Sequence, residues 1–211
     1  MKRAHSWLSA LLITTAGAFS IPAQAHVETA DELLKRLSSE VMATIKADPS
    51  IQAGDMSRVV SLVDSQILPN VNFTRMTASV VGRHWRQATP EQQQRLQSEF
   101  KTLLVRTYAG ALGEVKDQTL NFKTMRSKQE DTEVVVRSEV RGRGEPIQLD
   151  YRMEKTSTGW KIHDINVLGV WLVDAYRTQF VQEISARGLD GLIATLVQRN
   201  RANYTRSSAR P

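Results

Sequence analysis

The spacing of apolar residues changes abruptly at Gly113, and this change constrains the fold more than any other feature of the sequence. Before Gly113, leucine, valine and isoleucine recur every three or four residues, which is typical of amphipathic helices. After it, apolar and polar residues alternate, as in strands with one face in solvent. Helical spacing returns after Leu168. The sequence therefore predicts one α+β domain.

The helical part before Gly113 divides into four predicted helices. Periodic apolar residues cover residues 31–47 and 55–68, and a short helix is expected over residues 72–82. The longest helix is expected over residues 89–112, because Thr89 suits an N-cap and Pro90 suits the first helical position. Two more helices are expected at the end of the domain, over residues 171–187 and 189–199, with Gly188 as the helix C-cap between them.

The alternating part predicts four antiparallel strands, at residues 120–124, 134–140, 147–153 and 160–168. The apolar residues of the last strand change parity, because Trp160 and Ile162 fit one face whereas Ile165 and Val167 fit the other. A bulge near His163 and Asp164 would bring all four onto one face. We therefore expect a curved four-stranded antiparallel sheet packed with five to six helices. The residue pattern alone does not distinguish a filled apolar core from an apolar cavity between them.

The N-terminus has the pattern of a cleaved export signal. Lys2 and Arg3 precede an uncharged apolar run over residues 7–21, and small residues follow at Ala23 and Ala25. The run is shorter than the roughly 20 residues needed to cross a bilayer. We expect residues 1–25 to be removed, residues 26–201 to form the domain, and residues 202–211 to be a polar, basic, flexible tail. The absence of cysteine excludes disulfides, thiol nucleophiles and lipidation of an N-terminal cysteine.

The positive net charge does not indicate a nucleic-acid-binding protein. Without Lys2 and Arg3 the chain has 26 basic and 22 acidic residues, and the excess is supplied by arginines 199, 201, 206 and 210. The body before them is neutral, whereas a nucleic-acid binder needs a basic stripe on its folded surface. No nucleic-acid partner is expected.

The sequence offers little for catalysis or metal binding. It contains no HExxH zinc pattern and no GxSxG nucleophile elbow. His163 and Asp164 form the one adjacent acid–base pair, and an inward-facing Asp164 could act as a general base in a small isomerase or dehydratase. Adjacent strand residues point to opposite faces, so this enzyme interpretation requires the bulge to turn them together. We predict no enzyme, no metal site and no cofactor.

An ordered set of motifs resembles the MlaC family, also described as the Ttg2 toluene-tolerance proteins. The similarity extends over about residues 30–201, and the segment that usually reads Gly-Val-Ser-Leu has Trp171 in place of the serine. The motifs are Gly82-Arg83-His84-Trp85-Arg86-Gln87-Ala88-Thr89-Pro90-Glu91-Gln92, Phe100-Lys101-Thr102-Leu103-Leu104-Val105-Arg106-Thr107-Tyr108, Gly159-Trp160-Lys161-Ile162-His163-Asp164, Tyr176-Arg177-Thr178-Gln179-Phe180 and Gly188-Leu189-Asp190-Gly191-Leu192.

The resemblance implies a monomeric periplasmic phospholipid carrier. Its cargo would be held by the acyl chains in an apolar cavity between the sheet and the helices. It would exchange lipid with an inner-membrane ABC transporter complex and an outer-membrane lipoprotein–porin complex, and so maintain the lipid asymmetry of the outer membrane. A periplasmic adaptor with a solid core that binds no lipid is a further alternative.

The candidate lipid-binding residues lie on the longest predicted helix, on the sheet and around the junction that follows the sheet. For each of them, plain core packing is the alternative interpretation. The arginine among them, Arg177, is the candidate neighbour of an anionic headgroup near the cavity mouth. The candidates are Phe100, Leu103, Leu104, Tyr108, Val134, Val136, Leu149, Tyr151, Val167, Val170, Trp171, Val173, Tyr176, Arg177 and Phe180.

Overall fold

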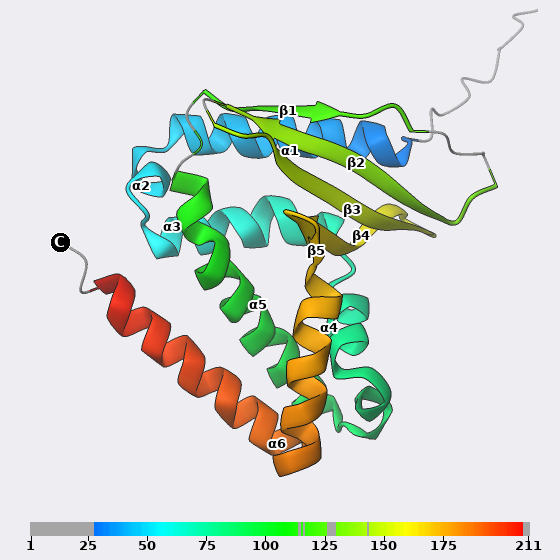
Figure 1. Cartoon of the computed structure of the whole chain (residues 1–211), viewed down its shortest axis with the longest axis vertical. Helices are drawn as coiled ribbons and strands as arrows, with labels where there is room; N and C mark the ends of the chain where they lie inside the picture. Colours follow the sequence, from blue (N-terminus) through cyan, green and yellow to red (C-terminus); the bar gives the residue numbers. More distant parts are fainter. Residues whose placement is uncertain (1–27, 114, 116, 126–129, 143, 209–211) are drawn as a thin grey trace, which may run out of the picture.

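The computed structural model describes residues 28–113, 115, 117–125, 130–142 and 144–208. The predicted signal at residues 1–25 and the last three residues of the predicted tail lie outside the described residues. Figure 1 shows a layer of strands with a helix along it, above a group of longer helices. None of the described helices is long and apolar enough to cross a membrane.

The first half of the chain is helical, as the sequence predicts. Its α-helices are α1 (Ala30–Ala47), α2 (Pro49–Gln52), α3 (Met56–Leu62), α4 (Phe73–Val81) and α5 (Pro90–Gly113). The predicted N-cap of α5 is confirmed: Thr89 Oγ1 accepts from the Gln92 backbone N–H, and the Gln92 side chain accepts in return from the Thr89 N–H. Together these bonds satisfy orphan donors at the helix start.

The predicted helix over residues 55–68 is interrupted. After α3 the chain forms a π-helical turn, η1 (Val63–Ile67), and a 3₁₀ turn, η2 (Leu68–Asn70). The Leu68 N–H bonds to the carbonyl of Val63, five residues earlier, and Pro69 has no N–H with which to continue the α-helix. Apolar spacing could not predict this interruption, because it depends on which backbone carbonyl the Leu68 N–H meets and not on which residues are apolar.

The sheet has five strands rather than the four predicted. They are β1 (Thr119–Phe122), β2 (Glu133–Arg141), β3 (Ile147–Thr156), β4 (Gly159–Val167) and β5 (Val170–Trp171), paired antiparallel in sequence order. The two residues of β5 pair back onto β4 through a tight turn in which Leu168 has φ 54° and Gly169 has φ 86°. The prediction missed β5 because a strand of two residues has no periodicity.

The predicted bulge in β4 is confirmed. Arg152 of β3 lies opposite Asp164 and its neighbour Met153 lies opposite Ile162, so His163 is the extra residue. The insertion shifts the parity of the strand and brings Ile162 and Ile165 onto the same face.

Three apolar clusters hold these elements together. One joins α1 to the inner face of the sheet, and we call it the sheet cluster. A second, the helix cluster, joins α4, α5 and α6. A third joins the end of α1 to α2, α3 and the later part of α5. Ile165 on β4 packs against both the sheet cluster and the helix cluster, so it marks the place where the two meet.

The final helix, α6 (Leu172–Ser208), is bent at Gly188, which has φ 71° and ψ −177°. Figure 1 shows its two arms diverging from the bend, the first beside α4 and the second beside α5. The predicted break at Gly188 is therefore correct. The second arm continues as helix to Ser208, beyond the expected end near Arg199.

Candidate lipid-binding site

Most of the candidate residues fall into two of the clusters just described. The helix cluster contains Phe100, Leu103, Leu104, Val173, Tyr176 and Phe180. The sheet cluster contains Val134, Val136, Leu149 and Tyr151. The fold thus brings the candidates into two apolar groups that meet at Ile165. Tyr108, Val167, Val170, Trp171 and Arg177 belong to neither group.

Four aromatic rings form the centre of the helix cluster. The Phe100 ring centroid lies 5.7 Å from that of Phe73 and 5.3 Å from those of both Tyr176 and Phe180. Phe100 and Phe180 are 0% and 1% exposed, so neither borders space that a water molecule could enter. In this conformation the two side chains are part of the closely packed core. Val136 on the sheet, 0% exposed, is buried to the same degree.

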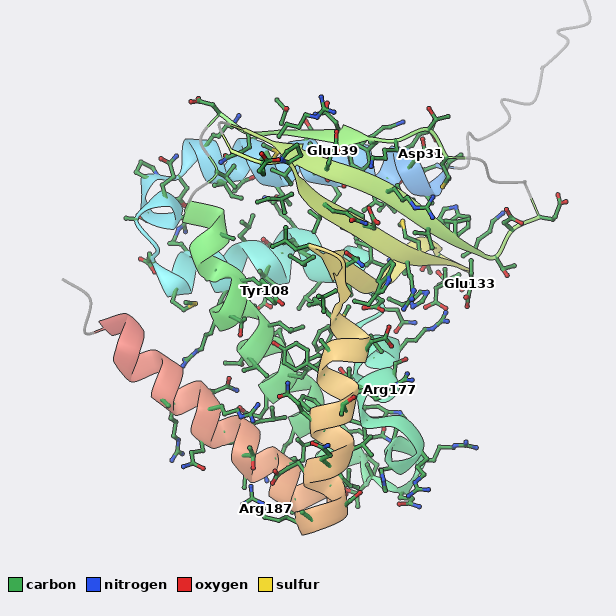
Figure 2. The ribbon with its side chains drawn as sticks, viewed as in Figure 1. Asp31, Tyr108, Glu133, Glu139, Arg177 and Arg187 are labelled. Carbon is green, nitrogen blue, oxygen red and sulfur yellow. The ribbon has the colours of Figure 1, made fainter. Side chains whose placement is uncertain are left out.

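Other candidates keep part of their surface exposed to solvent. Leu104, Tyr108, Leu149, Val167 and Tyr176 are all half-buried. Burial, together with the nearby Tyr176, raises the pKa of the Tyr108 hydroxyl. Figure 2 shows Tyr108 on the part of α5 that approaches the sheet. These incompletely packed side chains, rather than the buried aromatics, are the ones that an apolar ligand could contact without displacing the core.

An exposed apolar patch adjoins these residues at one end of the sheet. Leu168 is 66% exposed, Val170 53% and Ile147 43%. They are neighbours, because the Leu168 N–H bonds to the Gln148 carbonyl at 3.0 Å and Val167 pairs with both Leu149 and Val170. Of the three, only Val170 is among the lipid-binding residues predicted from the sequence. The available signal for Leu168 was its position before Gly169, where a turn exposes a large apolar side chain.

Asp164 is a structural acceptor that joins the sheet to the start of α6. Its Oδ1 accepts from the N–H groups of Ile165 at 2.9 Å and Val173 at 3.0 Å, and its Oδ2 accepts from Arg152 Nη1 at 2.8 Å. Asp164 is 1% exposed, and burial raises the pKa of its carboxyl against the effect of these bonds. Because both oxygens are engaged, the geometry does not support Asp164 as a general base.

The same junction fixes Trp171. The Arg152 guanidinium carbon lies 3.9 Å from the centre of the Trp171 ring, which is a cation–π contact. Arg152 Nη1 is also 3.7 Å from Asp174 Oδ2. Trp171 is therefore bound to the network that connects β3, β4 and α6.

His163 lies in a different environment from Asp164. The charges that act on it belong to Arg75, Glu133, Glu154 and Asp164, and Arg75 itself pairs with Glu154 at 2.5 Å and Glu133 at 2.7 Å. Burial, followed by the Arg75 charge, lowers the pKa of His163. The bulge thus holds the histidine in a salt-bridge cluster, separate from the bonds made by Asp164.

Arg177 lies apart from the apolar candidates. Its Nε donates to the Ser79 carbonyl at 2.9 Å, and it lines a surface pocket of about 560 Å³ between α4, α6 and the 3₁₀ turn η3 (Gly82–Gln87). Among the described residues, no other candidate lines this pocket. A second pocket, of about 500 Å³ near Asp48 and Arg58, contains none of the candidates. Neither pocket is the apolar cavity that we expected, and no cluster able to hold a metal ion is found in the described part of the chain.

Comparison with known proteins identifies the family. A model of the MlaC protein family matches residues 35–198. This chain belongs to the MlaC family. The resemblance found in the sequence is thereby confirmed, and so is the mixed class of the fold, with the fifth strand as the correction.

Named relatives agree with this assignment. The chain is 24% identical over 186 residues to the intermembrane phospholipid transport system binding protein MlaC of Haemophilus influenzae, covering 86% of this chain and 87% of the relative. It is 23% identical over 164 residues to the toluene tolerance protein ttg2D of Pseudomonas putida, covering 77% and 76%.

A solved structure extends the comparison to three dimensions. The phospholipid-binding protein of Ralstonia solanacearum, determined in complex with a phospholipid, is 48% identical and superposes with a TM-score of 0.80. The match covers 82% of this chain and 97% of that structure. The fold of this chain is therefore one that has been observed with a phospholipid bound.

Proposed function

We propose that this protein is a phospholipid carrier that holds its cargo by the acyl chains between the sheet cluster and the helix cluster. The observation that carries the proposal is the 48% identity to a protein of the same fold that was solved with a phospholipid bound. The names of the Haemophilus and Pseudomonas relatives point to the same role.

The physical need for such a carrier is large. A diacyl lipid has on the order of 30 methylene groups, and each costs ~0.8 kcal/mol to expose to water. A protein that carries it needs a continuous apolar lining and no reactive group. The half-buried Leu104, Tyr108, Leu149, Val167 and Tyr176 supply such a lining from both sides of the junction. Acyl chains bound between these side chains would take the place of solvent, so that the apolar surfaces of the lipid and the protein contact each other.

The exposed patch of Ile147, Leu168 and Val170 is our proposed point of lipid access. Contiguous exposed apolar patches mark ligand-binding grooves and surfaces that contact proteins or membranes. Val167 and Leu149 continue inward from the patch along the two paired strands. A lipid that enters here would meet the half-buried residues first and the aromatic core last.

The cellular setting follows from the family. We propose that the protein is a monomer working in the periplasm, where it exchanges lipid with an inner-membrane ABC transporter complex and an outer-membrane lipoprotein–porin complex. In this role it would help to maintain outer-membrane lipid asymmetry. The export signal predicted at the N-terminus supports this location, and the name of the Haemophilus relative supports transport between membranes.

Solvent extraction of the purified, folded protein tests the proposal. Mass spectrometry of the extract should detect diacyl phospholipid in near-stoichiometric amount. A lipid-free extract, together with no uptake from phospholipid vesicles, would instead favour the adaptor with a solid core. An enzyme would require a turnover that Asp164→Asn abolishes in a protein without bound lipid.

A further inference from the structure

We propose that the pocket beside η3 binds the headgroup phosphates of anionic phospholipids in a membrane surface, and so seats the carrier on the membrane. The proposal rests on the carrier function proposed above, because a carrier must reach a membrane to exchange its cargo. The pocket is separate from the acyl-chain site: its walls come from α4, η3 and the first arm of α6.

Arginine dominates the pocket, and no carboxylate lines it. Its charged side chains are those of Arg75, Arg83, Arg86 and Arg177. Arg75 is neutralised by Glu133 and Glu154, as described above. Arg83 and Arg86 are exposed and make no ion pair within the described part of the chain, and Arg177 contacts only a backbone carbonyl through its Nε. Three guanidinium groups therefore face one pocket without a counter-charge.

This arrangement is unusual within the protein itself. The body of the chain is neutral, and several other surface arginines have acidic partners, such as Arg58 with Asp48 at 2.6 Å and Arg36 with Glu28 at 2.8 Å. Gathering three like charges in one place has a Coulombic cost that a bound anion would reverse. Planar guanidinium groups pair with phosphate through two parallel hydrogen bonds, and phosphate is the anionic group that phospholipid headgroups present.

The other walls suit a membrane interface better than a dissolved ion. Trp85, Val181 and Ala78 contribute apolar surface beside the arginines. The Nε2 atom of His84, also in the pocket, is buried and has no hydrogen-bond partner among the described residues. Tryptophan together with arginine is typical of the headgroup region of bilayers. A phospholipid can meet the arginines with its phosphodiester and the apolar wall with the carbons that flank it.

The position of the pocket is compatible with contact to a flat surface. Figure 2 shows Arg177 on the first arm of α6, on the side of that arm that lies beside α4. Arg83 and Arg86 extend the same face through η3, where both side chains are exposed.

Vesicle flotation tests the proposal with the full-length mature protein. The vesicles contain either phosphatidylcholine alone or phosphatidylcholine with phosphatidylglycerol. We expect wild type to float with the anionic vesicles, and Arg83→Gln/Arg86→Gln to bind them about 30-fold more weakly, because each basic residue near an anionic surface contributes about a fivefold factor. Raising the salt concentration should weaken binding of the wild type.

The matched control is Arg137→Gln/Lys155→Gln. This variant removes the same charge from two exposed side chains on β2 and β3, neither of which lines the pocket. It should bind anionic vesicles as the wild type does. Equal loss in both double variants would overturn the proposal, since general charge would then explain binding.

Two further outcomes would also overturn the proposal: wild type that ignores anionic vesicles, and wild type that binds inorganic phosphate at Arg83 and Arg86 but no vesicles. Phospholipid extracted from the same samples separates a failure of the proposed membrane contact from a failure of the proposed carrier function. If the Arg83→Gln/Arg86→Gln variant retains its phospholipid cargo, it still works as a carrier and has lost only its contact with the membrane. A wild type without cargo would count against the carrier function, whatever the vesicles show.

Discussion

At the scale of single residues, the junction between the sheet and α6 depends on one buried carboxylate. Asp164 binds two backbone N–H groups and Arg152, which in turn covers the Trp171 ring. Sequence reasoning could place Asp164 beside a bulge, but it could not tell which face would be covered by a helix that begins several residues later. Trp171 is predicted as a cavity residue because it lies at the junction after the last strand, in place of the family's usual serine. Its contact with Arg152 on β3 could not be predicted from the sequence.

The substitution Asp164→Asn should destabilise the protein by about 2 kcal/mol, because a buried charge-assisted hydrogen bond to Arg152 is lost while the backbone donors keep an acceptor. Urea unfolding measures the change. The control is Asp174→Asn, whose exposed carboxylate lies 3.7 Å from the same arginine and should cost less than ~0.5 kcal/mol. Equal effects of the two substitutions would contradict the assigned role.

His163 should make stability depend on pH in a defined direction. Its pKa in the folded protein lies below the usual value of 6.5 because of burial and the Arg75 charge. The unfolded chain therefore binds more protons in the interval between the two pKa values, and stability must fall as the pH decreases through that interval. Between about pH 7 and pH 5, wild type should lose stability relative to His163→Gln in urea unfolding. A constant difference between the two proteins would show that burial does not lower the pKa.

At the scale of helices and strands, the sequence predicts those features that depend on residues close together in the chain. The N-cap of α5, the bulge in β4 and the break at Gly188 all followed from residue types and parity. The π-helical turn η1 and the short strand β5 did not, because each is defined by backbone hydrogen bonds that leave no periodic pattern in the residue types.

The bend in α6 should depend on glycine at position 188. Its backbone, at φ 71° and ψ −177°, is in a region that only glycine occupies readily, although a Cβ there would meet no atom within 4 Å. Gly188→Ala should therefore cost about 1–3 kcal/mol from backbone strain alone. Gly110→Ala in the straight helix α5 has equal space and should stabilise by about 1 kcal/mol. Thermal unfolding compares the two, and a neutral Gly188→Ala would mean that the bend is not fixed by this residue.

At the scale of the whole molecule, the candidate site divides into residues that are already packed and residues that are not. Composition could predict that the helices and the sheet share an apolar interior, but not which side chains fill it. Phe100, Phe180 and Val136 are fully buried, whereas Leu104 and Val167 retain open surface. Whether a side chain is buried or keeps open surface depends on how α5 lies relative to the sheet. That arrangement is set by contacts between residues far apart in the sequence, so the sequence pattern does not predict it.

A carboxylate placed in the proposed acyl-chain site should expel the lipid. Val167→Glu should lower the co-purifying phospholipid at least about tenfold, because an unpaired carboxylate against acyl carbon costs several kcal/mol. Val135→Glu is the matched control, since Val135 is 41% exposed on β2 and is not part of the proposed lining. Circular dichroism should show both variants folded. Full lipid occupancy in Val167→Glu would remove Val167 from the site.

The most direct test of the acyl-chain site is photo-crosslinking with a phospholipid that carries a diazirine in one acyl chain. After the protein is loaded with this lipid and irradiated, peptide mass spectrometry locates the covalent adducts. We predict adducts on α5 around Leu104 and Tyr108 and on the inner face of β3 and β4, at Leu149 and Val167. Adducts confined to the outer face of the sheet or to η3, or none in a folded protein exposed to the lipid, would contradict a carrier that holds its cargo between the sheet and the helices.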